Sequence, residues 1–296
     1  MLIIFNFVTI FLRNRMQILT TTQELRHFIA NFKTTNPTKT IGLVPTMGAL
    51  HNGHLSLITK SKEICDCTIV SIFVNPTQFG ENEDFNQYPR KKEADLNICQ
   101  KAGVNVIFMP EIAQIYPLDF TLQTTLNAPQ SMANVLEGAA RPGHFNGVLQ
   151  VVLKLFALVQ PTHAFFGQKD AQQLLIIQKM VEDLFLPITI IPCPIVRTQE
   201  GLALSSRNAY LSPSGKQEAL KISNALNTIT KAIMQGIQDS KTLQNIGLEV
   251  LSGMDIEYFV IVNKALKPID TIQKDSTLIL IVARVEGVRL LDNLWF

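Results

Sequence analysis

The residues from Pro45 to His54 form the string P-T-M-G-A-L-H-N-G-H, which is the most informative part of the chain. An apolar run at 41–44 precedes it and an amphipathic stretch at 55–60 follows it, which predicts a strand, a glycine-bearing turn and a helix start. A helix N-terminus carries unpaired N–H donors and the positive end of the helix dipole, so it attracts phosphate. His51 and His54 would lie there, where they can donate hydrogen bonds to charge that develops on a phosphate.

Two other interpretations of this histidine pair are exposed residues on a helix surface and zinc ligands. Zinc would need further ligands, and the common metalloprotease motif has a glutamate after the first histidine and a spacing of four residues. Neither feature is present. H-x-G-H after a strand resembles instead the signature of the nucleotidyl transferase superfamily of α/β proteins, whose members activate an acid or a phosphate with a nucleoside triphosphate.

The composition limits the class of protein. The chain has 296 residues, of which 47% are hydrophobic and 17% charged, as in compact globular proteins with one large domain or two ordinary ones. A net charge of +2 gives no electrostatic case for nucleic acid as a partner. The cysteines lack the spacing of a zinc site and are interpreted as buried, reduced thiols of a cytoplasmic protein. They are Cys65, Cys67, Cys99 and Cys193.

The first fifteen residues differ from the rest. Residues 1–12 are nearly all apolar, but this run is too short to span a bilayer and resembles no signal peptide. A membrane-surface anchor would need basic residues on one face of an amphipathic helix, whereas here they follow the run. We interpret 1–15 as a leader outside the fold that arises from an upstream start codon, with no membrane partner, and expect a chain that starts at Met16 to fold and react normally.

Apolar runs alternate with helical patterns as far as about residue 195. This alternation predicts βαβ units and a doubly wound parallel sheet, with ligands at the carboxyl ends of its strands. The segment 121–140 fits less well, and we expect a short extra strand and a loop there. The expected strands are 40–45, 67–74, 104–109, 163–166 and 188–196, and the expected helices are 23–33, 54–65, 90–101, 145–159 and 170–185.

The pattern changes after about residue 200. Ser212 and Pro213 suit the N-cap and first position of a helix that we expect to reach about Gln235. Helices followed by consecutive strands predict a small α+β domain, so we expect one domain at 16–198 and a second at 199–296. The other expected elements are a helix at 240–252 and strands at 257–262, 277–284 and 288–292.

Further polar blocks follow the predicted strands. Gln78 comes after a strand that ends at Asn75-Pro76, and on its own it could be only part of a polar loop. Lys169 and Asp170 lie between a glycine turn and a helix, where the lysine can reach phosphates and the aspartate can be an N-cap. Gln173 would project from the same helix face as Asp170.

Two more blocks lie in predicted loops. Ser205, Ser206 and Arg207 suit a phosphate clamp, although alone they could be a capping loop. Arg141 and His144 precede an apolar helix.

These blocks, in this order, resemble the pantothenate synthetase (pantoate–β-alanine ligase) family from about Met16 to the end. Two features depart from it: the apolar leader, and Leu204, where the family usually has methionine and where leucine should still cover an adenine face. The matching strings are P-T-M-G-A-L-H-N-G-H, S-I-F-V-N-P-T-Q-F-G, N-E-D-F-N-Q-Y-P-R, L-E-G-A-A-R-P-G-H-F-N-G-V, F-G-Q-K-D-A-Q-Q and L-S-S-R-N-A-Y-L.

The resemblance implies a Rossmann-like domain, similar to that of class I aminoacyl-tRNA synthetases, and a smaller C-terminal lid. It implies an ATP-dependent ligase, in the cytoplasm and as a homodimer, that joins pantoate to β-alanine. The pantoate carboxylate would attack the α-phosphate of ATP to give pantoyl adenylate and pyrophosphate. The β-alanine amine would then attack the acyl carbon to give pantothenate and AMP, because a mixed anhydride is a far better acyl donor than a carboxylate.

The resemblance also assigns roles to residues of the ATP site. His54 matches the residue usually called the proton donor, but we interpret His51 and His54 as donors to phosphate oxygens because a carboxylate nucleophile has no proton to lose. Lys169 should contact phosphate, and Asp170 should contact the ribose. Arg207 should contact the phosphates together with Ser205 and Ser206. The ATP-binding residues are expected to be Met47, Gly48, His51, His54, Gly167, Gln168, Lys169, Asp170, Val196, Leu204, Ser205, Ser206 and Arg207, with Val196 and Leu204 flanking adenine.

Gln78 and Gln173 should hold the hydroxyl and carboxylate groups of pantoate. Mg²⁺ should bridge phosphate oxygens, with Asp95 as a helper ligand or else as a solvated carboxylate on a helix face. A different adenylyl transferase, which moves AMP onto a phosphate, would share the H-x-G-H loop but not the two glutamines. A non-catalytic ATP sensor would be expected to lose Lys169 or a histidine, and both are kept.

Overall fold

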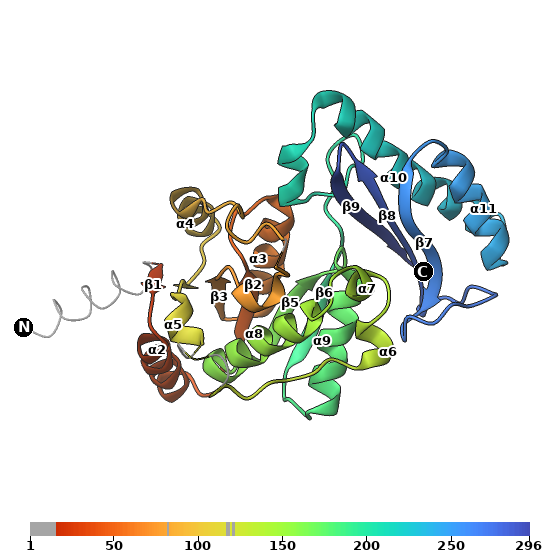
Figure 1. The fold of residues 1–296 in the computed structure, drawn as a ribbon. Helices are drawn as coiled ribbons and strands as arrows, with labels where there is room; N and C mark the ends of the chain where they lie inside the picture. Colours follow the sequence, from red (N-terminus) through yellow and green to blue (C-terminus); the bar gives the residue numbers. More distant parts are fainter. Residues whose placement is uncertain (1–15, 82, 117–118, 120–121) are drawn as a thin grey trace, which may run out of the picture.

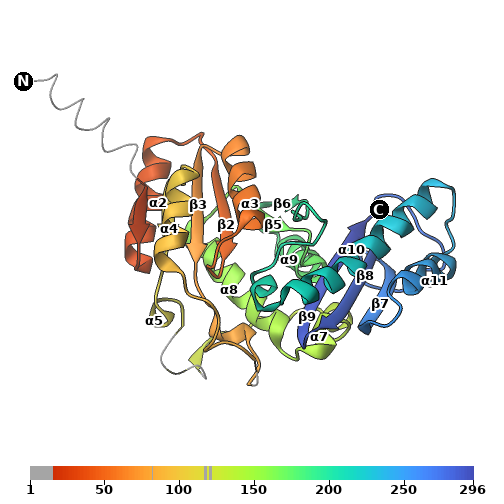
Figure 2. The ribbon, with the colours of Figure 1, turned by 90° about the horizontal axis from the view of Figure 1, so that it is seen from above.

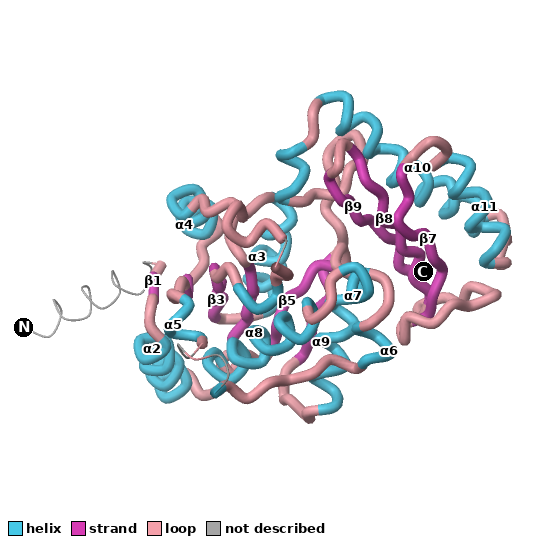
Figure 3. Tube along the Cα trace, in the orientation of Figure 1, coloured by secondary structure: helices cyan, strands magenta, loops and turns pink. Residues whose placement is uncertain are grey.

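The larger part of the molecule is a six-stranded parallel sheet (Figures 1 and 3). The computed structural model describes residues 16–81, 83–116, 119 and 122–296, so the predicted leader at 1–15 lies outside the described residues. The strand order is β1-β4-β3-β2-β5-β6. The strands are β1 (Gln17–Leu19), β2 (Ile41–Thr46), β3 (Cys67–Ile72), β4 (Val106–Phe108), β5 (His163–Gly167) and β6 (Thr189–Cys193).

Helices cover both faces of this sheet. Successive strand residues point to opposite faces, so Leu43 packs in one core with Leu149, while its neighbour Val44 packs in another with Ile58. The predicted doubly wound architecture is therefore confirmed. The main helices are α2 (Thr22–Thr35), α3 (Asn52–Ile64), α4 (Lys92–Lys101), α8 (His144–Val159) and α9 (Ala171–Asp183). The shorter helices are η1 (Pro76–Gln78), α5 (Ile112–Ile115), α6 (Gln130–Ala133), α7 (Glu137–Ala140) and η3 (Ser206–Tyr210).

The strand order places a topological switch point between β2 and β5. The chain runs from β2 through β3 to β4 in one direction, and β5 and β6 lie on the other side of β2. Ligands of open α/β sheets bind outside the carboxyl ends of strands at such a point. The turn after β2 contains the histidine motif and the turn after β5 contains Lys169, so both lie where the fold favours a ligand.

The smaller part is an antiparallel sheet with two helices against one face, as predicted (Figure 2). Ser212 is the N-cap of the first helix and accepts a hydrogen bond from Gly215 N at 3.0 Å, and Pro213 is the first helical residue. Alternate residues of the sheet face two ways: Phe259 packs towards the helices, and Tyr258 packs towards the larger sheet. The elements are α10 (Pro213–Met234), α11 (Ser240–Val250), β7 (Asp255–Asn263), β8 (Thr277–Val285) and β9 (Val288–Trp295).

The expected extra strand at 121–140 is wrong. The described residues 122–140 contain α6 and α7 and no strand. Gln172 explains this conformation, since its Nε2 donates to Met132 O and Val135 O while its Oε1 accepts from Glu137 N. Strand β1 was not predicted, and the domain boundary at 198/199 stays a prediction. None of the helices in the described part of the chain has the length and apolarity needed to cross a membrane.

Candidate active site

A cavity of about 520 Å³ opens at the switch point and is lined on its other side by residues of the smaller sheet. It collects predicted site residues from five separate segments of the chain. Those that line it are Met47, His51, His54, Gln78, Gly167, Lys169, Asp170, Gln173, Val196, Leu204, Ser205, Ser206 and Arg207. The structure thus brings these side chains together, and their individual roles stay predictions.

The two histidines fix one another at the start of α3. His51 is the N-cap, and its Nδ1 accepts a hydrogen bond from Gly53 N at 3.1 Å. The Nδ1 of His54 accepts from His51 N at 3.3 Å, and the ring centroids are 4.2 Å apart. Because an Nδ1 that accepts a hydrogen bond carries no proton, each neutral ring carries its proton on Nε2.

Both rings are held in the neutral form. Burial lowers the pKa of His54 to about 3, and the neighbouring His51 acts in the same direction. Burial also lowers the pKa of His51, followed by the charge of Lys169. Neutral rings with a proton on Nε2 are hydrogen-bond donors, which agrees with donation to phosphate and not with transfer of a proton from an imidazolium.

Asp95 lies on α4, contacts the same loop and is not the solvated carboxylate considered from the sequence. It is only 2% exposed, so the solvated carboxylate is wrong. Its oxygens accept from Ala49 N at 2.9 Å and Leu50 N at 2.7 Å. The left-handed backbone of Gly48, at φ +86°, brings the loop so close that a Cβ there would lie 3.0 Å from Asp95 Oδ2. The carboxylate thus serves as an acceptor for the loop, and its part in magnesium binding stays a prediction.

Gln78 is held from several sides at the end of η1. Its Oε1 accepts from Asn75 Nδ2 at 3.1 Å, and its Nε2 donates to Met47 Sδ at 3.0 Å. Asn75 is 1% exposed and also accepts from Tyr116 OH at 2.7 Å. A buried amide held in this way offers a rigid surface to a polar ligand.

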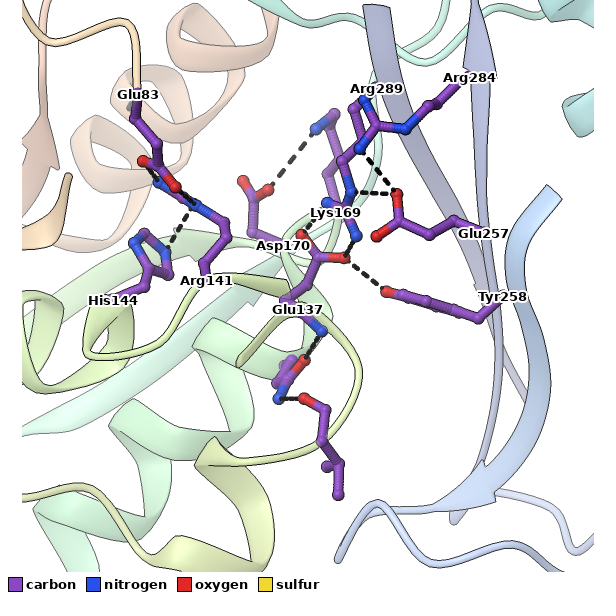
Figure 4. A network of polar contacts seen from close by, with 12 residues as sticks. Glu83, Glu137, Arg141, His144, Lys169, Asp170, Glu257, Tyr258, Arg284 and Arg289 are labelled. Atoms are coloured by element: carbon purple, nitrogen blue, oxygen red, sulfur yellow. Dashed lines mark hydrogen bonds and ion pairs between the residues drawn. The ribbon is translucent and has the colours of Figure 1, made fainter. Parts of the chain in front are cut away.

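Arg141, His144 and Glu83 form a cluster (Figure 4), and its arginine and histidine bind the backbone carbonyl of Gln78. His144 Nδ1 donates to Gln78 O at 2.7 Å, so its Nε2 is free to accept from Arg141 NH1 at 3.0 Å. Arg141 also binds Glu83 at 2.6 Å. Burial, followed by the Arg141 charge, lowers the pKa of His144 to about 4, which keeps this link neutral.

The second turn, Gly167 to Asp170, joins β5 to α9. Asp170 is the N-cap of α9, but its side chain makes no capping bond to any described residue. It lies instead 3.5 Å from Lys169 Nζ, and both residues line the cavity. The backbone of the turn is bonded to the next strand, because Gln168 N donates to Cys193 O at 2.8 Å.

The segment from Val196 to Arg207 forms a further wall. Val196 and Leu204 are adjacent because Leu204 N donates to Val196 O at 2.9 Å. Ser205 caps η3 by accepting from Arg207 N, so the capping role considered for this loop is present. Arg207 pairs with Asp84 at 3.2 Å, and both residues line the cavity.

Sequence reasoning missed a cluster that joins the two parts of the molecule (Figure 4). Arg289 on β9 binds Glu137 on α7 and Glu257 on β7, and Tyr258 OH donates to Glu137 Oε1 at 2.7 Å. Glu137 lies within one of the strings that carry the family resemblance, which was a usable signal. Its partner Arg289 is 152 residues away, and no local pattern indicates that contact.

Comparison with known proteins agrees with this geometry. The sequence pattern of the Pantoate-beta-alanine ligase family matches residues 17–295. Pantothenate synthetases of Wolinella succinogenes and Helicobacter pylori strain G27 are 59% and 50% identical to this chain over 280 residues, which is 95% of this chain and all of each relative.

Two solved structures of this kind are similar throughout. Pantothenate synthetase from Thermus thermophilus has a TM-score of 0.86 at 38% identity and covers 94% of this chain and 98% of its own. Pantoate-beta-alanine ligase from Francisella tularensis, solved with beta-gamma ATP and beta-alanine, has a TM-score of 0.76 at 35% identity, over 95% and 98% of the two chains. The chain with the two turns and the cavity described above belongs to the pantoate–β-alanine ligase family.

Proposed function

We propose that this chain condenses pantoate with β-alanine, driven by ATP, through a pantoyl adenylate. The observation that carries the proposal is the shared cavity at the switch point, where two helix-initiating turns suited to phosphate lie beside two glutamines. Membership of the family supports the same reaction, as does the Francisella relative solved with ATP and β-alanine.

In the first step the pantoate carboxylate attacks the α-phosphate, and the bond from that phosphorus to pyrophosphate breaks. Negative charge then grows on the phosphate oxygens. The Nε2–H groups of His51 and His54 and the ammonium of Lys169 are the donors placed to receive it, and their fixed positions avoid reorganisation during the reaction. Since the carboxylate loses no proton, neutral histidines suffice for this step.

Gln78 and Gln173 are proposed to bind pantoate, because each amide can both donate to a carboxylate and accept from a hydroxyl. In the second step the β-alanine amine attacks the acyl carbon, the bond to the AMP oxygen breaks and the amine loses a proton. The smaller sheet lines one side of the cavity and would limit the access of water to the adenylate. The remaining proposed contacts are Val196 and Leu204 on adenine, Asp170 on the ribose, and Ser205, Ser206 and Arg207 on phosphates.

Mg²⁺ is proposed to accompany ATP and to neutralise phosphate charge when bound. It prefers phosphate oxygens and water to protein cages. Within the described part of the chain no group of three or more His, Cys, Asp or Glu side chains is placed to hold a metal, and Asp95 accepts hydrogen bonds from the turn after β2. We therefore assign Mg²⁺ to the nucleotide and to no particular side chain.

A homodimer in the cytoplasm completes the proposal. The four cysteines are free and buried, as suits a reducing compartment. Sedimentation of the purified chain at several concentrations tests the dimer.

The test of the reaction is product analysis with ATP, pantoate and β-alanine. We expect pantothenate and AMP in equal amounts. ADP as the product, or nucleotide cleavage without pantothenate, would overturn the proposal. A phosphate-bearing acceptor that replaced pantoate as substrate would favour the rival adenylyl transferase.

A further inference from the structure

Strand β9 holds the lysine turn from the opposite sheet. Asn293 Nδ2 donates to Gln168 O at 3.0 Å and to Lys169 O at 2.7 Å. Trp295 Nε1 also donates to Gln168 O, at 3.2 Å. These carbonyls belong to the peptide units on either side of the Lys169 Cα, so the three bonds fix the backbone that directs the lysine side chain.

The burial of the Asn293 side-chain oxygen has a cost in stability. The residue is 4% exposed and lines the cavity, yet within the described residues its Oδ1 has no hydrogen-bond partner. A buried amide with an unpaired oxygen destabilises a fold, and an apolar side chain of similar volume would avoid that cost. An amide at this position is explained by its hydrogen bonds to the two carbonyls of the turn.

The strand is itself anchored to the larger sheet. Arg197, which follows β6, binds the buried Asp292 with NH2 to Oδ1 at 2.8 Å, and Asn293 N donates to the same Oδ1 at 2.8 Å. Trp295 packs against the core of the larger part, whereas Leu294 packs on the other face of the sheet against the helices. The position of Asn293 is therefore determined by a buried ion pair and by packing.

We propose that Asn293 and Trp295 are positioning residues of the ATP site, which act through the backbone of Gln168 and Lys169. They hold the Lys169 ammonium where charge develops on the leaving phosphate. The inference rests on the proposed function, because it requires Lys169 to contact phosphate. It follows that these two residues matter for formation of the adenylate and not for its reaction with β-alanine, in which no phosphate leaves as pyrophosphate.

The test separates the two half-reactions in the full chain. Asn293→Leu removes both donors at similar volume, and Trp295→Phe removes one donor and keeps an aromatic ring. We expect kcat for pantoate-dependent pyrophosphate exchange to fall about tenfold to 100-fold in Asn293→Leu and less in Trp295→Phe, as for a misplaced catalytic group. The reaction of preformed pantoyl adenylate with β-alanine should be unchanged, and so should KM for pantoate.

Leu294→Val is the matched control, since it weakens the same strand on the opposite face. A merely structural role predicts that all three variants lower both half-reactions in proportion to their loss of melting temperature, and that result would overturn the proposal. Unchanged exchange in both Asn293→Leu and Trp295→Phe would also overturn it. If Asn293→Leu does not fold, the exchange rate of Trp295→Phe alone tests the positioning role.

Two further measurements complete the test. Lys169→Ala separates the proposed function from the positioning role. Intact pyrophosphate exchange in Lys169→Ala would refute the role of Lys169 itself. Reduced exchange in Lys169→Ala together with normal exchange in the Asn293 and Trp295 variants would refute only the positioning role. Trp295 is the single tryptophan of the chain, so its emission reports on the turn. We expect ATP to change this emission in the unmodified chain. Without ATP, Asn293→Leu should shift the emission to longer wavelength. An unaltered spectrum in both cases would contradict the contact between Trp295 and the turn.

Discussion

Two turns meet at the carboxyl ends of neighbouring strands, and they are held in opposite ways. The turn after β2 is held by its own helix start, where His51 and His54 cap one another, and by Asp95 from α4. The turn after β5 has no such local cap among the described residues, and its Gln168 and Lys169 carbonyls are bound from β9. The first turn is therefore held within the larger part of the molecule, whereas the second is held both by β6 and by the smaller sheet.

This difference teaches how the two parts of the molecule share one site. Loss of the smaller sheet from its place should leave the histidine turn intact and remove from the lysine turn the hydrogen bonds donated by Asn293 and Trp295. The proposed binding of ATP to the histidines and the proposed stabilisation of the leaving phosphate by Lys169 should then be separable. Substitutions can test them one at a time, as follows.

Removal of a donor from either turn should have the largest effect. His54→Ala and Lys169→Ala should each lower kcat for adenylation by about 10²–10³, with a smaller rise in KM for ATP, because each donor acts mainly on charge that develops in the transition state. Single-turnover formation of AMP-linked pantoate measures this. His27 is an exposed histidine on α2, and His27→Ala is the control. Near-normal single turnover in His54→Ala would refute its assignment.

Asp95→Ala should unfold the histidine turn and leave the lysine turn in place. Two buried N–H groups lose a charged acceptor, so we expect a loss of roughly 2–4 kcal/mol of stability together with a higher KM for ATP. Asp95→Asn keeps one good acceptor and should lose about half as much. Chemical denaturation measures the effect, and Glu93→Ala, on the exposed face of the same helix, is the control. Equal stability of Asp95→Ala and Glu93→Ala would show that the carboxylate does not hold the loop.

Gln78→Ala and Gln173→Ala test the part of the cavity beside both turns. Each should weaken pantoate binding roughly tenfold to 100-fold and leave ATP binding unchanged, since lost hydrogen bonds to a charged ligand have about this cost. Calorimetry with each substrate in turn is the measurement. If ATP affinity fell as much as pantoate affinity, the glutamines would belong to the fold of the site and not to the recognition of pantoate.

The lowered pKa of His54 gives a test that is specific to the turn after β2. Its pKa is about 3 in the folded chain, against about 6.5 when unfolded. Between these values the unfolded state binds the additional proton, so stability rises with pH and is lost as pH falls from 6.5 towards 3. The loss at pH 5 should be on the order of 1–2 kcal/mol and should be smaller in His54→Gln. Denaturation at pH 7 and pH 5 checks this, and an identical pH dependence of the two proteins would disprove it.

Leu204→Met should have the smallest effect. Leucine and methionine have similar volume and both can pack on a flat ring, so KM for ATP should change by no more than about threefold. Steady-state kinetics with varied ATP measures it. A larger change would mean that this wall of the cavity makes a more specific contact with the nucleotide than packing.

Sequence patterns predicted the elements whose cause is local. The alternation of apolar runs and helices indicated the parallel sheet, and Ser212-Pro213 indicated the start of α10. The motif around His51 and His54 located one turn and the glycine before Lys169 located the other. In each case the physical cause, a cap, a turn or a hydrophobic face, lies within a few residues.

The errors share a different cause. The segment 122–140 became two short helices because Gln172, on a distant helix, binds its backbone. Asp95 was expected at a solvated position because its helix pattern alone cannot show that a loop with unpaired N–H groups packs over it. Asn293 reaches its turn across more than a hundred residues of sequence, and no periodicity of β9 indicates that contact.

Pyrophosphate exchange with ATP tests the central claim most directly. If the cavity activates pantoate as an adenylate, labelled pyrophosphate should enter ATP when pantoate is present, whether or not β-alanine is added. AMP should not accumulate without pantoate. Exchange that required β-alanine, or AMP formed in the absence of pantoate, would contradict the account.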